Sequence, residues 1–217
     1  MTLAEAHTVA ARATALDVRS GPKFPANLID DERQWRFRPR RSGTVSSALS
    51  VAATRWRSLE CRTREVGADT PADCHVVAIV LRNRNVRFSV SGRMLHDGPA
   101  TPGMVHVTEP AAAARCVFRG PYDVLHLYVP NRLIAVICGD ISRHESVTLS
   151  SQTPLTWDSM IEALARALLA AERIGGSYGR LYADSVSIAI VARLLSLARR
   201  ADASERPRVA ESLPNGD

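Results

Sequence analysis

Long apolar runs, secretion signals and regularly spaced cysteines are missing from this 217-residue sequence. No uninterrupted run of about 18 apolar residues occurs, so no segment is expected to span a membrane. The first 20 residues lack both a basic start and a continuous apolar stretch, so no secretory signal is expected. The four cysteines (Cys61, Cys74, Cys116 and Cys138) fit neither a disulfide framework nor a zinc motif. We therefore expect a reduced, cytoplasmic protein.

Lysine is almost absent, because Lys23 is the only one among 28 basic residues. A net charge of +6 and a pI near 9.7 would ordinarily indicate a polyanionic partner. The strong preference for arginine, together with abundant alanine, instead indicates the nucleotide composition of the gene. The net charge therefore does not by itself predict a nucleic-acid partner.

Catalytic signatures are also missing. The sequence has no G-x-S-x-G elbow, no phosphate-cradling loop and no dinucleotide fingerprint. Each cysteine lies in strand-like or apolar surroundings, where inert thiols are the usual case. We expect no catalytic residue, no resident metal and no cofactor.

The two ends of the chain have the composition of unfolded segments. Residues 1–53 are predicted to form a flexible, arginine-rich leader, in which five arginines fall between residues 33 and 41 beside Trp35 and Phe37. The alternative is a basic-aromatic arm that contacts phosphates and bases. Residues 201–217 are polar and contain proline, which predicts a tail or the start of a linker.

Residues 54–140 have the pattern of short strands separated by turns. "HVVAIVLR" (75–82) is apolar on both faces, and "NVRFSV" (85–90) alternates apolar and polar residues before a Ser-Gly turn. About six strands at roughly ten-residue spacing are typical of a sandwich or a small barrel. The segment ends in a short apolar helix, "NRLIAVIC" (131–138).

Residues 141–200 have helical periodicity. Thr156 is the predicted N-cap of a first helix, whose apolar stripe comprises Trp157, Met160, Ile161, Leu164 and Leu168. "GGS" (175–177) predicts a reversal into a second helix, which is apolar over more than one face and therefore needs two partners. The barrel is one partner, and either a second copy of the chain or the neighbouring helix is the other. The residues expected at a dimer interface are Leu181, Ile188, Val191, Leu194 and Leu195.

Two long stretches carry a resemblance to a known family. "HVVAIVLRNRNVRFSVSGRMLHDGPATPGMVHVTEPAAAARCVFRGPYDVLHLYVP", followed by "LARALLAAERIGGSYGRLYADSVSIAIVARLLSLA", resembles the amino-terminal half of AraC-type transcriptional regulators. The most specific pieces are the Pro102-Gly103 turn, the strand 123–130 and "GRLYADSVSIAIVARLL", and the resemblance covers about residues 54–200.

The resemblance implies an α+β fold, in which a cupin-like antiparallel β-barrel is followed by an antiparallel helical pair. It also implies a small-molecule effector in the barrel and a homodimer through the helices. In the family, a carboxy-terminal domain with two helix-turn-helix motifs binds DNA. Seventeen residues after Arg200 cannot hold such a domain, so we expect a fragment, a truncated product or a stand-alone sensor half.

The resemblance also suggests ligand-binding residues. In the arabinose-responsive member, an arginine ending the strand that matches "AIVLR" contacts the sugar, and the matching residue is Arg82. Cys116 stands near the family's aromatic contact, a departure that argues against the same sugar. The last barrel strand offers Asp123 and Leu125 on one face and His126 and Tyr128 on the other, and the sequence leaves open which face is interior.

A metal-dependent cupin enzyme, or a stand-alone small-molecule-binding cupin, is the alternative hypothesis. Metal cupins typically carry a His-x-His pair, a glutamate and a later histidine, because residues two apart share a strand face. Here His106 and Glu109 are three apart, so on a continuous strand they face opposite sides. A site built from His96, His106 and His126 across strands remains open. We favour a non-catalytic sensor, with direct nucleic-acid binding by the leader as a third possibility.

Overall fold

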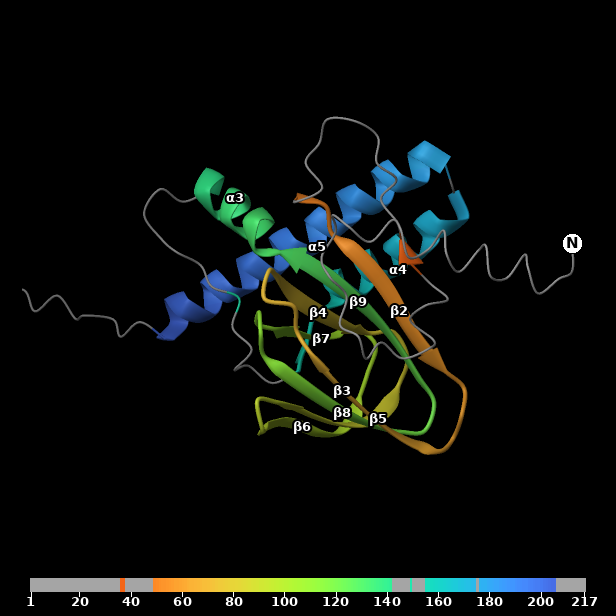
Figure 1. Ribbon diagram of the computed structural model, residues 1–217. Coiled ribbons are helices and arrows are strands. Elements are labelled where there is room, and N and C mark those ends of the chain that lie inside the picture. Colours follow the sequence, from red (N-terminus) through yellow and green to blue (C-terminus); the bar gives the residue numbers. More distant parts are fainter. Residues whose placement is uncertain (1–35, 38–48, 142–148, 150–154, 175, 206–217) are drawn as a thin grey trace, which may run out of the picture.

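The computed structural model describes residues 36–37, 49–141, 149, 155–174 and 176–205, and the elements are labelled as in Figure 1. The described strands are β1 (Arg36–Phe37), β2 (Ala52–Ser58), β3 (Thr63–Asp69), β4 (Cys74–Val80), β5 (Arg84–Val90), β6 (Arg93–Ala100), β7 (Met104–Thr108), β8 (Ala113–Arg119), β9 (Tyr122–Pro130) and β10 (Thr156–Trp157). The described helices are α3 (Asn131–Ile141), α4 (Ser159–Ile174) and α5 (Gly176–Glu205).

The strands form two packed antiparallel sheets. One has the order β1-β2-β9-β4-β7-β10, and the other has the order β3-β8-β5-β6. Figure 1 shows the helices on the side of the six-stranded sheet that faces away from the four-stranded sheet. The expected α+β class, with antiparallel strands before a helical pair, is therefore confirmed, but the strands form two sheets rather than one closed barrel.

The long strand β9 shows how side-chain alternation builds these layers. Successive side chains of a strand point to opposite faces. Leu125, Leu127 and Val129 belong to the core between the six-stranded sheet and the helices, whereas Tyr122 and Val124 belong to a second core between the sheets. Both faces of β9 are thus buried, which explains its nearly continuous apolar sequence.

Helices α4 and α5 form an antiparallel pair that covers the six-stranded sheet. The α4 residues Ile161, Ala165 and Leu168 are fully buried and pack in the same core as Ile190 and Val191 of α5. The short reversal between Ile174 and Gly176 agrees with the predicted "GGS" turn. The predicted short helix at 131–138 is also confirmed and extends to Ile141 as α3.

The predicted N-cap Thr156 is wrong, because Thr156 and Trp157 form β10, paired with β7. The cap is Asp158, whose Oδ1 accepts a 2.9 Å hydrogen bond from the backbone N–H of Ile161. The same carboxylate binds Arg193 of α5, with 2.7 Å between Nη2 and Oδ2. Trp157 is consequently exposed at 57% and lies outside the apolar stripe predicted for this helix.

The Pro102-Gly103 turn, which is part of the family resemblance, holds the start of α4 in place. The indole Nε1 of Trp157 donates to the Pro102 carbonyl at 3.1 Å, and the Asp158 N–H donates to the Gly103 carbonyl at 3.1 Å. Gly103 has a φ of +86°. A Cβ added to this residue would lie 3.0 Å from the Cβ of Glu162. Glycine is therefore required at this turn for both its backbone angle and its size.

Residues 93–100 form strand β6, although the segment "DGPATPG" (97–103) is rich in glycine and proline. This strand lies at the edge of the four-stranded sheet, where Pro99 needs no ladder partner on its outer side. The turn is confined to residues 101–103, and His96 lies within the strand, paired with Phe88.

Most of the predicted leader, residues 1–53, and of the predicted tail, residues 201–217, lies outside the described residues. Within the leader, Arg36–Phe37 pairs with β2 as a two-residue strand. One helical stretch, Gly176–Ala201, is long and apolar enough to cross a membrane by length and composition, with a mean hydropathy of 1.6. Core helices pass the same test, and 39% of this stretch is buried in the structure.

Candidate functional site

A cavity of about 90 Å³ lies between the two sheets. The six-stranded sheet contributes Trp56, Val76, Ala78, Val80, His106, Thr108, Val124, His126 and Tyr128 to its lining, and the four-stranded sheet contributes Val66, Gly67, Ala68, Asp69, Arg84, Val86, Phe88, Ala114, Cys116 and Phe118. Thr70, Pro71 and Leu155 complete it from outside the strands. Most of the lining is hydrocarbon, with a few polar side chains among it.

Strand register gives the cavity two distinguishable ends. Val80 pairs with Val124 at one end, and Val76 pairs with Tyr128 towards the other. The first end is lined by buried side chains, among them Trp56, Val80 and Phe118. The second end runs towards Thr70, Pro71 and the exposed Asp69. The polar side chains at the buried end are therefore the ones shielded from water.

Arg84 carries the positive charge at that end and is partly buried. On β5, the inward positions are Arg84, Val86, Phe88 and Val90, so an arginine occupies a position at which the alternation places core residues. Its Nε and Nη1 atoms are buried, and none of the hydrogen bonds or ion pairs among the described residues satisfies them. Its guanidinium carbon lies 5.0 Å from the centroid of the Phe118 ring. Burial lowers the pKa of Arg84 to about 10, so the side chain is still protonated at neutral pH.

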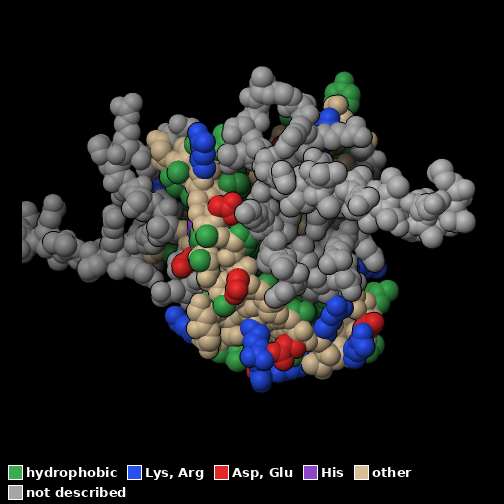
Figure 2. Space-filling view, viewed as in Figure 1, with side chains coloured by type: hydrophobic (Ala, Val, Ile, Leu, Met, Phe, Trp, Pro, Cys, Tyr) green, Lys and Arg blue, Asp and Glu red, His purple; other side chains and the backbone are tan. Residues whose placement is uncertain are grey.

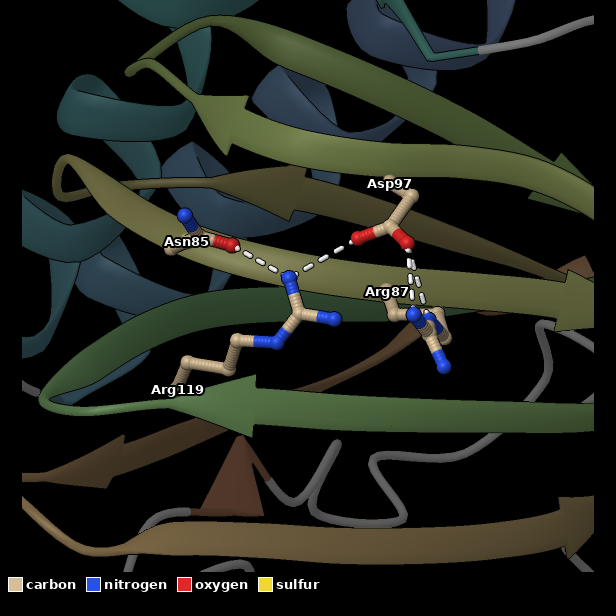
Figure 3. Close-up of polar contacts among 4 residues, drawn as sticks. All are labelled: Asn85, Arg87, Asp97 and Arg119. Carbon is tan, nitrogen blue, oxygen red and sulfur yellow. Dashed lines mark hydrogen bonds and ion pairs between the residues drawn. The ribbon is translucent and has the colours of Figure 1, made fainter.

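The arginines on the outer face of the same sheet contrast with Arg84. Figure 3 shows Asp97 between Arg87 and Arg119, with 2.9 Å from Arg87 Nε to Oδ2 and 2.8 Å from Arg119 Nη1 to Oδ1. Arg119 Nη1 also donates to Asn85 at 3.0 Å. Figure 2 shows basic and acidic side chains side by side over this part of the molecule. The outer arginines are thus neutralised by carboxylates, whereas Arg84 on the inner face is not.

Two further titratable groups in the cavity are held neutral. Burial, and secondarily the charge of Arg84, lower the pKa of His126 to about 3. Burial raises the pKa of the Cys116 thiol to about 12, against a smaller opposing effect of Arg84. The His126 ring lies 4.4 Å from the Trp56 ring, between centroids, and Trp56 Nε1 is a buried donor without a partner among the described residues. Arg84 is the only arginine or lysine in the described lining, and the one carboxylate there, Asp69, is exposed.

The ligand-binding residues expected from the sequence separate into two groups. Cys116, His126 and Tyr128 line the cavity, whereas Arg82, Asp123 and Leu125 do not. Leu125 faces the helices. Asp123 is also on that face of β9 and binds Arg55, with 2.7 Å from Nε to Oδ1 and 2.6 Å from Nη2 to Oδ2. The interior face of β9 is thus the one that carries His126 and Tyr128.

The placement of Arg82 needs correction. Its sequence parity matches Val76, Ala78 and Val80, all of which line the cavity, but strand β4 ends at Val80. Arg82 falls in the bend that follows and is exposed. The inward arginine is Arg84, two residues later and at the start of the next strand. Extending the alternation of Val86, Phe88 and Val90 back by one step would have found it in the sequence.

The predicted dimerisation residues fall into a buried group and an exposed group. Val191, Leu194 and Leu195 are buried in the core of the same chain, so the neighbouring helix and the sheet are the partners of this face of α5. Leu181 and Ile188 are exposed at 66% and 46%, and Tyr178 and Tyr182 on the same helix are exposed as well. An interface through α5 must therefore use the exposed set rather than Leu194.

The alternative metal site gains no support from the donor set. Within the described ranges, no group of three or more His, Cys, Asp or Glu side chains could hold a metal ion. His106 and His126 both line the cavity, but His96 and Glu109 do not. The His106 ring contacts Phe88 edge-on, with 4.7 Å between the ring centroids. The two cavity histidines are thus not part of a group of three donors within the described ranges.

No protein-family model and no curated protein sequence matches the chain. Among solved structures, the AraC-like transcriptional activator CuxR is similar at 15% identity and a TM-score of 0.41, covering 76% of this chain and 60% of that one. An RmlC-like cupin from Shewanella frigidimarina is similar at 15% identity over 39% of this chain and 69% of its own length, with a TM-score of 0.31. Salicylate 1,2-dioxygenase from Pseudoaminobacter salicylatoxidans is similar at 10% identity over 81% of this chain and 54% of its own length, with a TM-score of 0.36. Because these structures include a regulator and enzymes, the function of this chain is argued from its own site.

Proposed function

We propose that this chain is the effector-sensing and dimerisation part of an AraC-type transcriptional regulator, and that it acts without catalysis. The observation that carries the proposal is the cavity between the sheets, lined by hydrocarbon with a few polar side chains, as is typical of small-molecule sites. The motif order over residues 54–200 supports the regulatory assignment. DNA contact is assigned to a helix-turn-helix domain outside this chain, and the protein is expected in the cytoplasm.

Leu155 provides a route from the cavity to the helices. It lines the cavity and directly precedes β10, whose residues Thr156 and Trp157 pair with β7. Asp158 follows, caps α4 and binds Arg193 of α5. A ligand that contacts Leu155 therefore acts on the residues that position the helical pair. Because a ligand shifts an equilibrium only through differential affinity, this contact is where the two states of the sensor would differ.

Binding in the cavity is tested by thermal shift with a chemically diverse set of compounds of about ten non-hydrogen atoms. Ala78 lines the cavity between His106 and His126, so Ala78→Leu fills part of it. We expect some compounds to raise the Tm of the wild type but not of Ala78→Leu. The control is Ala163→Leu, at an exposed position on α4. If no compound acts in a manner that depends on Ala78, the proposed sensor function is wrong.

Dimerisation is proposed through the exposed apolar side chains of α5, namely Tyr178, Leu181, Tyr182 and Ile188. Apolar side chains at this helical spacing form one face that a second chain can cover. Ile188→Asp should give a folded monomer in light scattering, and Ala163→Asp on α4 should leave the dimer intact. A wild-type chain that is monomeric, or an Ile188→Asp chain that remains dimeric, would contradict this interface.

A further inference from the structure

The Nε and Nη1 atoms of Arg84 have no hydrogen-bond partner among the described residues, so an anion from outside the chain would satisfy them. Burying a charge without a partner is costly, and contact with the face of one aromatic ring offsets only part of that cost. The described part of the chain supplies that ring, Phe118, but no ion pair or hydrogen bond to Arg84. Asp123, the carboxylate whose charge acts on Arg84, is already engaged by Arg55 on the opposite face of the sheet.

The ligand that pairs with Arg84 is expected to carry one negative charge. The described lining holds one arginine and no lysine, and burial keeps its His126 and Cys116 side chains neutral. Asp69 is exposed at the other end, where a second negative charge on the ligand would be repelled rather than stabilised. A carboxylate carries one charge, and an arginine binds it with charge-assisted hydrogen bonds. A phosphate monoester carries up to two charges and needs more donors than this lining provides.

The size and lining define the rest of the ligand. A cavity of about 90 Å³ has room for roughly six to nine waters, or for a molecule with a similar number of non-hydrogen atoms. Beyond Arg84, the walls are built of residues such as Val86, Phe88 and Val76. The body of the ligand must therefore be apolar, because a polar body would lose its water without replacement hydrogen bonds.

We propose that the cavity binds a small organic acid, with its carboxylate on Arg84 and an apolar body of about ten atoms or fewer extending towards Thr70 and Pro71. This inference rests on the proposed sensor function and names the class of effector. The Phe118 ring lies against the Arg84 guanidinium, and Trp56 Nε1 is a further buried donor in the same cavity lining.

The experiment measures binding of butyrate, benzoate and cyclohexanecarboxylate to the purified chain by calorimetry, each beside its neutral amide. These acids have six to nine non-hydrogen atoms, which matches the cavity. We expect at least one acid to bind roughly ten- to a hundredfold more tightly than its amide, the range of a charge-assisted hydrogen bond. Arg84→Gln should abolish this preference, and the exposed Arg82→Gln should keep it.

The other outcomes of the binding experiment distinguish failure of the organic-acid inference from failure of the sensor function. If amides bind as tightly as acids, or if Arg84→Gln keeps the preference, the organic-acid inference is wrong while small-molecule binding stands. If neither acids nor amides bind and the thermal-shift set also finds no ligand, the sensor function fails as well. If Arg84→Gln does not fold, the acid-to-amide ratio of the wild type decides, with Arg84→Lys expected to retain a reduced preference for the acid.

Discussion

His106 of β7 and His126 of β9 stand on opposite sides of Ala78, which pairs with both of them across β4. The two histidines face the same cavity but are two strand spacings apart, about 10 Å between their backbones. Within the described residues, no further His, Cys, Asp or Glu joins them in a group of three that could hold a metal ion. The cavity thus has histidines without the arrangement of a cupin metal centre.

The first prediction concerns metal content. The chain purified without chelator should hold well under one transition-metal ion per protomer by elemental analysis, and His106→Ala should not change that value. The His126→Ala variant serves as the second readout. Stoichiometric iron, manganese or zinc that is lost in both variants would favour the metal-dependent cupin instead.

The second prediction concerns the cost of the unpaired charge. Arg84→Met removes a buried cation that lacks a carboxylate, so the ligand-free protein should become more stable by about 1–2 kcal/mol in urea unfolding. The matched variant is Arg55→Met, which removes a paired arginine and leaves Asp123 poorly satisfied. It should destabilise the fold by about 1–3 kcal/mol. Two variants that shift stability in the same direction would contradict the contrast between these arginines.

The contrast between Arg82 and Arg84 shows what the sequence could predict of this site. The apolar and polar patterning predicted short strands separated by turns over residues 54–140, and the structure has a run of short strands there. The patterning did not locate the end of β4, since "VLRNRN" contains no glycine or proline to mark a turn. An anchor placed two residues beyond a strand end therefore falls on the surface.

The helical segment shows a second limit. Leu194 and Leu181 have the same apolar character, yet Leu194 is buried in the core and Leu181 is exposed. The apolar periodicity predicts that α5 needs more than one partner. It does not predict which residues face the sheet, because that depends on how α4 and α5 are rotated about their axes. Likewise, both faces of β9 are apolar, so only the strand pairing distinguishes the cavity face from the helical face.

The third prediction concerns the junction of α4 and α5. Asp158→Ala removes both the α4 cap and the partner of Arg193, and should cost about 1–3 kcal/mol in the free energy of unfolding. Asp158→Asn keeps a capping oxygen and removes the charge, so its cost should be about 1 kcal/mol or less. Equal effects of the two variants would show that the cap contributes nothing.

The pH dependence of this junction follows from the same pair. The hydrogen bond with Arg193 holds the pKa of Asp158 below its ordinary value of 3.8. The stabilisation is therefore complete above about pH 4 and is lost as the pH falls through the lowered pKa. The stability difference between wild type and Asp158→Asn should shrink over that acidic interval in urea unfolding at stepped pH. A difference that is constant down to pH 2 would contradict the ion pair.

The fourth prediction concerns the contact between α4 and α5. A Cβ at Gly179 would lie 2.9 Å from the backbone oxygen of Ala171, which cannot move without shifting a helix. Gly179→Ala should therefore destabilise the fold by about 1–3 kcal/mol. The matched change Gly139→Ala in α3 meets open space and should stabilise by up to about 1 kcal/mol. A neutral Gly179→Ala would mean that the helices are not in this close contact.

The central claim is that this chain senses a small molecule and dimerises without a metal. Native mass spectrometry of the purified chain, with no metal added, tests it most directly. The account predicts a metal-free dimer, with any co-purified ligand no larger than about ten non-hydrogen atoms and lost in Arg84→Gln. A monomer that holds one transition-metal ion per chain would contradict it.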